Sequence, residues 1–163
     1  MNKYVIDTSA LIDAKETYPP ENFKPFWDLL HEMNDTGRLI IPKKVKEELE
    51  KGKDFLSNEF LINKKTTEDE DEETVNCLGY IMKKIPKGNR DGFQSWLKSP
   101  DPFVIACTLR ISRQIDEKNV MLIQCEVARG EKIKIPYVCN LLGIEVGKMS
   151  KLIIEEKIQF TIK

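Results

Sequence analysis

The chain has 163 residues, of which 33% are charged and 40% hydrophobic, as expected for one folded domain with a substantial core. Its formal net charge of −1 excludes nucleic-acid binding through overall charge, so any positive field must be local. No apolar run approaches the roughly 20 residues of a membrane helix and no signal-peptide pattern is present, so we expect a cytoplasmic protein without membrane contact.

The first stretch of the chain is an apolar run that ends in an acid. Residues 4–6 are typical of a buried strand in a parallel sheet. Asp7 follows at once, and Thr8 and Ser9 suit a turn or a helix N-cap. Ligands of open α/β sheets bind beyond the carboxyl ends of the strands, so Asp7 stands where a functional carboxylate would.

Helices and strands alternate through the next part of the chain. The apolar spacing predicts a helix over 23–33, a strand over 39–41, a helix over 43–51 and another over 53–62. Gly52 lies where a C-cap glycine is expected. Six consecutive acids at 68–73 are interpreted as the solvated first turn of a helix that is capped by Thr67 and runs to residue 85. A metal store is the less favoured interpretation, because adjacent side chains radiate around a helix.

The second half continues the alternation. Residues 87–100 predict a short helix or a lid, and Asp101 then starts a helix that runs to about residue 115. An apolar strand over 120–123 leads to Glu126, and a helix over 137–142 with Gly143 as its cap precedes a strand over 144–146. Apolar and polar residues alternate at 158–162, which predicts an edge strand or a contact with a partner.

Strands that alternate with helices predict an α/β fold whose sheet is parallel and whose strand ends meet at one rim. The predicted domain covers residues 1–147 and is followed by a C-terminal tail, 148–163. The four cysteines have no metal-ligand spacing, so we expect free thiols that are mostly buried.

Four acids are expected to approach this rim: Asp7 and Glu126 after strands, Asp101 at the start of a helix and Glu48 within one. Carboxylates that converge in one cleft repel each other unless a cation neutralises them. Hard oxygen ligands favour Mg²⁺ or Mn²⁺, and such ions support phosphodiester hydrolysis.

Four sequence motifs occur in an order that resembles the PIN-domain nucleases. They are V-I-D-T-S-A-L-I at 5–12, V-K-E-E-L at 45–49, D-P-F-V-I-A at 101–106 and the acid at 126. The later K-I-P-Y-V-C-N-L-L-G-I at 134–144 is similar to a bacterial and phage branch of that family. The resemblance covers roughly residues 3–146.

This resemblance implies a three-layer α/β/α sandwich with a mostly parallel sheet and a metal-dependent endoribonuclease that cleaves single-stranded RNA. It also implies a toxin of a toxin–antitoxin pair, with a protein antitoxin as partner and a homodimer as its assembly. By position, Asp7, Glu48, Asp101 and Glu126 would be the catalytic and metal-binding acids. Glu48 is chosen over Glu47 because the family glutamate directly precedes a leucine.

Several side chains could contact the substrate near these acids. Thr8 or Ser9 could offer a hydroxyl to a water or a phosphate. The basic residues near the acids could guide a phosphate backbone or could simply be solubility charges; they are Lys43, Lys44, Lys46, Arg129, Lys132 and Lys134.

Two alternative functions remain open from the sequence. A phosphotransferase with Asp7 as nucleophile would resemble a D-x-D-x-T site, but Ser9 occupies the place of its second acid. A non-catalytic PIN-like binding module with a degenerate site is the other alternative, because Gln124 and Glu126 depart from the family pattern.

Overall fold

The computed structural model describes residues 1–67, 70–87, 92–114, 119–127 and 132–162. One sheet of five strands lies at its centre, in the order β3-β2-β1-β4-β5. The strands are β1 (Lys3–Ile6), β2 (Leu39–Pro42), β3 (Thr66–Thr67), β4 (Val120–Ile123) and β5 (Val146–Gly147). Every neighbouring pair is parallel, so each connection must return to the opposite end of the sheet.

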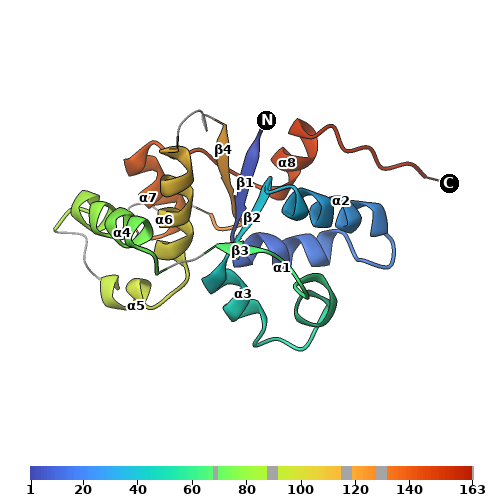
Figure 1. Ribbon diagram of the computed structural model, residues 1–163, viewed down its shortest axis with the longest axis horizontal. Helices are drawn as coiled ribbons and strands as arrows, with labels where there is room; N and C mark the ends of the chain where they lie inside the picture. Colours follow the sequence, from blue (N-terminus) through green and yellow to red (C-terminus); the bar gives the residue numbers. More distant parts are fainter. Residues whose placement is uncertain (68–69, 88–91, 115–118, 128–131, 163) are drawn as a thin grey trace.

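Helices fill these connections and cover both faces of the sheet. They are α1 (Thr8–Thr17), α2 (Lys24–Asp35), α3 (Lys43–Leu49), α4 (Glu72–Lys84), α5 (Phe93–Leu97), α6 (Asp101–Ser112), α7 (Ile135–Leu142) and α8 (Met149–Glu155), with a π-helical turn at Leu56–Phe60. In Figure 1, α1, α2 and α8 lie on one side of the sheet, and α4, α6 and α7 lie on the other. The predicted three-layer α/β/α sandwich is therefore confirmed.

The core is centred on β1, β4 and α6. All four residues of β4 are buried, and most of α6 is buried because it packs against the sheet on one side and against α4 on the other. Each fully buried Leu or Ile side chain stabilises the fold by about 1.5–3 kcal/mol. This packing fixes the N-terminal end of α6, where Asp101 lies, against the carboxyl ends of β1 and β4.

Most predicted elements are confirmed with small shifts at their ends. The structure contains the predicted strands at 39–42 and 120–123 and the short helix at 93–97. It also contains the helix with Pro102 in its first turn and the cap at Gly143. All four cysteines are free thiols and three of them are buried. Among the described residues, no helix is long and apolar enough to cross a membrane.

The region that follows β1 and β2 differs from the prediction. Asp7 caps a full helix, α1, where the sequence predicts only a turn or a cap. α3 ends at Leu49, and the φ angle of Gly52 is not left-handed, so this glycine is not the predicted C-cap. The helix predicted over 53–62 is only the π-helical turn at Leu56–Phe60, and the left-handed φ of 60° at Asn63 lies just beyond it.

The predicted cap of α4 is also wrong. Thr67 belongs to β3, and Asp71 caps α4 by accepting a hydrogen bond of 2.7 Å from the backbone N–H of Thr74. The first two acids of the run, Glu68 and Asp69, lie outside the described residues, as does Arg129. The described acids Glu72 and Glu73 lie in the first turn of α4, as the helix-dipole argument predicts.

The C-terminal tail contains no edge strand among its described residues. The last strand is β5, and residues 149–155 form α8, whose Met149 and Leu152 belong to the core. Beyond α8, the ring of Phe160 stacks on that of Tyr18 with a centroid separation of 5.7 Å. Phe160 therefore packs on aromatic side chains of the main body, and the apolar alternation does not reflect pairing with the sheet.

Candidate active site at the carboxyl ends of the strands

Asp7 lies at the point where β1 becomes α1. Its carboxylate accepts hydrogen bonds from the backbone N–H of Ser9 (3.2 Å) and from the Ser9 hydroxyl (2.6 Å). The side chain is only 4% exposed, and this burial raises its pKa, although the bonds from Ser9 oppose the rise. The charge of Glu126 raises the pKa of Asp7 further.

Two hydroxyl groups hold the acids in place. Ser9 Oγ donates to Asp7 and accepts a bond of 3.0 Å from the backbone N–H of Cys125, which joins the segments that follow β1 and β4. Thr8 Oγ1 donates to Glu48 Oε2 at 2.5 Å, which draws α3 towards the same edge. Both hydroxyls proposed as substrate contacts are thus engaged with protein groups in this structure.

Asp101 is the first residue of α6, and the charges of the three other acids all affect the pKa of its carboxyl group. Burial raises the pKa of Asp101 to about 7, and the charges of Asp7, Glu126 and Glu48 add to this rise. Lys134 acts in the opposite direction. Because all three of the other acids affect it, Asp101 shares one electrostatic environment with them, as the sequence predicts.

Glu126 follows β4, and only one of its two carboxylate oxygens contacts another side chain in the described structure. Lys134 Nζ lies 3.2 Å from Glu126 Oε1, whereas Oε2 is buried and has no hydrogen-bond partner in the described structure. Gln124 Oε1, two residues earlier, is also buried and unpartnered. Lys132 is exposed, so Lys134 is the cation that the structure brings into direct contact with an acid here.

The two adjacent glutamates of α3 point to different partners. Glu48 contacts Thr8, next to Asp7, whereas Glu47 lies 3.7 Å from Lys44. This arrangement places Glu48, rather than Glu47, with the other predicted acids. We call Asp7, Glu48, Asp101 and Glu126 the acidic edge.

The donor chemistry of the acidic edge suits a hard divalent cation. Its oxygens are carboxylate oxygens, and Glu126 Oε2 is buried without a hydrogen-bond partner in the described structure. Burial, with the charges of the other acids added to it, raises the pKa of Asp101 to about 7. However, no group of three or more His, Cys, Asp or Glu side chains in the described part of the chain is arranged to hold a metal ion. A bound cation would therefore have to draw these side chains closer together.

A cavity of about 470 Å³ opens beside the acidic edge, between α3 and the segment that leads into α6. Its lining includes Glu48, Lys44, Lys51, Lys98 and Phe103. Lys44 Nζ lies 5.2 Å from the centroid of the Phe103 ring. The sequence pattern singled out Lys44 but not Lys51, Lys98 or Phe103, although Lys98 is only three residues before Asp101.

Taken together, these features define an α/β/α protein of one parallel sheet with an acidic edge at its carboxyl end. Residues 4–160 match the model of a family described as a domain of unknown function (DUF4411), and the chain belongs to that family. No match was found among curated proteins or among solved structures. The family description names no activity, so a function for this protein has to be argued from the chemistry of its acidic edge.

Proposed function

We propose that this protein is a metal-dependent endoribonuclease that hydrolyses phosphodiester bonds of single-stranded RNA, as its resemblance to the PIN-domain nucleases implies. The observation that carries the proposal is the crowding of carboxylates around Asp101, whose pKa is raised to about 7. Gathering four acids at one end of the sheet has no evident structural benefit, whereas a divalent cation would relieve their repulsion.

Asp7, Glu48, Asp101 and Glu126 would hold Mg²⁺ or Mn²⁺. Such an ion supplies charge stabilisation at a phosphate oxygen and lowers the pKa of an attacking water. The role of the protein is to present the acids: Ser9 fixes Asp7, and Thr8 fixes Glu48. Lys134, beside Glu126, is the described cation best placed to contact a phosphate, and exposed Lys132 could contribute further along the strand.

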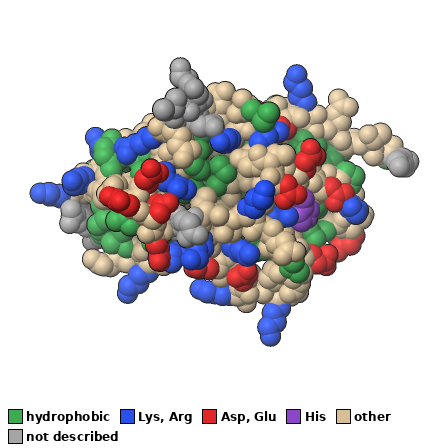
Figure 2. All heavy atoms as spheres, viewed as in Figure 1, with side chains coloured by type: hydrophobic (Ala, Val, Ile, Leu, Met, Phe, Trp, Pro, Cys, Tyr) green, Lys and Arg blue, Asp and Glu red, His purple; other side chains and the backbone are tan. Residues whose placement is uncertain are grey.

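The cavity beside the acidic edge supports a nucleic-acid substrate. Lys51 and Lys98 supply positive charge for a phosphate backbone. Lys44 is paired with Glu47 and Glu70, and it would have to move off the Phe103 ring before that ring could stack on an unpaired base. Acidic and basic side chains are interspersed over the face shown in Figure 2, with no single large patch of either charge. The positive field is therefore local, as a net charge of −1 requires.

The biological setting follows from the resemblance alone. A nuclease of this kind would act in the cytoplasm as the toxin of a toxin–antitoxin pair. A protein antitoxin would hold it inactive, and it would assemble as a homodimer.

The proposal is tested by cleavage of mixed single-stranded RNA in Mn²⁺, Mg²⁺ or EDTA. We expect cutting with either metal and none in EDTA, and a loss of at least about 100-fold in Asp7→Asn and in Asp101→Asn, because each removes a charged ligand. Glu48→Gln should also lose activity, whereas its matched control Glu47→Gln should retain it. Full activity of Asp7→Asn, or an equal loss in Glu47→Gln, would contradict the assignment.

A non-catalytic binding module is the second candidate, and one observation favours it. The described residues form no ready-made metal-binding group, and the hydroxyls of Thr8 and Ser9 are already engaged. This candidate predicts RNA binding that Lys98→Gln weakens, with no cleavage and no binding of Mn²⁺ by calorimetry. Metal binding that Asp101→Asn abolishes would exclude it.

A further inference from the structure

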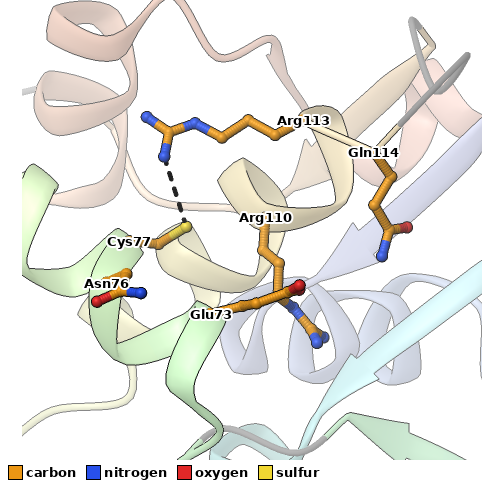
Figure 3. A pocket seen from close by; sticks show the side chains of 6 residues that line it. All are labelled: Glu73, Asn76, Cys77, Arg110, Arg113 and Gln114. Atoms are coloured by element: carbon orange, nitrogen blue, oxygen red, sulfur yellow. Dashed lines mark hydrogen bonds between the residues drawn. The ribbon is translucent and has the colours of Figure 1, made fainter.

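A second cavity, of about 490 Å³, lies between α4 and the C-terminal end of α6. Its six lining side chains are those of Glu73, Asn76 and Cys77 from α4, Arg110 from α6, and Arg113 and Gln114 directly after it (Figure 3). Asp101 begins α6, so the helix separates this cavity from the acidic edge by about 18 Å, at about 1.5 Å per residue. A volume of this size suits a small molecule.

Arg113 presents a positive charge to this cavity that no described carboxylate neutralises. Its guanidinium carbon lies 4.5 Å from the centroid of the Tyr80 ring, and its Nη1 lies 3.9 Å from Cys77 Sγ, the contact drawn as a dashed line in Figure 3. Burial raises the pKa of the Cys77 thiol, so the sulfur stays neutral. The ring and the thiol therefore position the guanidinium without cancelling its charge.

Arg110 also lines the cavity, on the opposite side from the guanidinium of Arg113. Its Nη1 is paired with Asp71 Oδ2 at 2.8 Å, but its Nε is buried and has no acceptor in the described structure. Buried donors without an acceptor are rare in folded proteins, because each costs free energy. In Figure 3 the guanidinium of Arg110 points away from that of Arg113, so Arg113 carries the charge that is available to a ligand.

We propose that this cavity binds a small polar molecule through a carboxylate or phosphate group held by Arg113. The side-chain amides of Asn76 and Gln114 would form hydrogen bonds with the uncharged part of the ligand, since each amide offers both a donor and an acceptor. Glu73, exposed in the lining, disfavours a polyanion such as RNA. The site is independent of the proposed nuclease activity.

The test is calorimetric titration of the full chain with inorganic phosphate, adenosine monophosphate and succinate. We expect saturable binding of at least one of these anions at millimolar concentration or below, and the anion that binds assigns the group as phosphate or carboxylate. Arg113→Gln should weaken that binding at least tenfold, and Arg113→Lys should weaken it less, because the charge remains without the planar fork.

Lys24→Gln is the matched control, because it removes an exposed cation from α2, on the other side of the sheet. It should bind the anion as the wild type does, and circular dichroism should confirm that all variants are folded. Absence of binding by the wild type, unchanged binding by Arg113→Gln, or loss of binding in Lys24→Gln would overturn the proposal.

Discussion

Asp101 illustrates how a functional arrangement acts on a single side chain. It lies in the first turn of α6, where the helix dipole favours a negative charge, yet its pKa is raised to about 7. Burial and the neighbouring acids outweigh the dipole. Because the folded state holds this proton more tightly than the unfolded state, the charge of Asp101 lowers stability above pH 7, and this loss disappears as the pH falls through about 7 towards about 4.

Asp101→Asn should therefore stabilise the metal-free protein. The charge of Asp101 is disfavoured by burial and by the neighbouring acids. Removing it is expected to raise the free energy of unfolding at pH 8 by up to about 4 kcal/mol, and the gain should vanish near pH 4. Urea unfolding in EDTA at both pH values measures it. As a control, Asp71→Asn should show no gain at pH 8, because the hydrogen bond from Thr74 lowers the pKa of Asp71. No gain in stability for Asp101→Asn would show that the charge of Asp101 does not destabilise the folded protein.

At the same scale, the sequence predicted which acids approach one rim but not what holds them. Asp7 and Glu126 follow strands, so their placement depends on local signals that can be read along the chain. The bond from Thr8 to Glu48 and the contact between Lys134 and Glu126 join distant elements and depend on side-chain rotamers. Lys51 and Lys98 were missed for the same reason, since only the folded chain brings them to one cavity.

At the scale of elements, predictions succeeded where one residue type imposes a backbone conformation. Gly143 was predicted as the cap of α7 and adopts φ +68°, a conformation that side chains with a Cβ rarely take. The edge-strand prediction for the tail is wrong because its alternation has a different cause, whereas a contact of the tail with a partner stays a prediction. Phe160 packs on rings of the main body while Ile162 is 98% exposed, so a two-residue period arose without a partner strand.

Gly143→Ala should destabilise the protein by about 1 kcal/mol through backbone strain alone, because a Cβ at this position meets nothing within 4 Å. Gly79 is the matched control: it lies inside α4 without a left-handed φ, and its added Cβ also meets open space. Gly79→Ala should therefore stabilise by about 0.5–1 kcal/mol. Thermal unfolding of both variants measures the two changes in stability, which should have opposite signs. A change of the same sign in both would show that backbone conformation does not decide the effect.

At the scale of the whole molecule, one polar network joins the two ends of the chain. The Tyr4 hydroxyl, from β1, donates to Glu156 Oε1 at 2.7 Å, and Arg38 Nη2 lies 2.5 Å from the same oxygen. The Tyr4 ring is fully buried, and burial together with Glu156 raises the pKa of its hydroxyl. The network anchors the end of α8 against the sheet and makes the tail part of the folded body.

Tyr4→Phe should lower the free energy of unfolding by about 1–2 kcal/mol, because it removes a hydrogen bond to a charged acceptor while keeping the ring. Tyr137→Phe is the matched control, since the described residues offer no hydrogen-bond partner to that hydroxyl. Chemical unfolding at pH 7 should separate the two variants. Equal stability of Tyr4→Phe and the wild type would show that the network does not hold α8.

The position of β1 between β2 and β4 has a consequence for how the protein is made. β1 is synthesised first, but its neighbour β4 is formed by residues 120–123, and Glu126 comes later still. Translation proceeds from the N-terminus, so Asp7 is synthesised well before Glu126, the last acid of the edge. Chains that terminate before Glu126 therefore lack a complete acidic edge, and the site can form only after Glu126 has been synthesised.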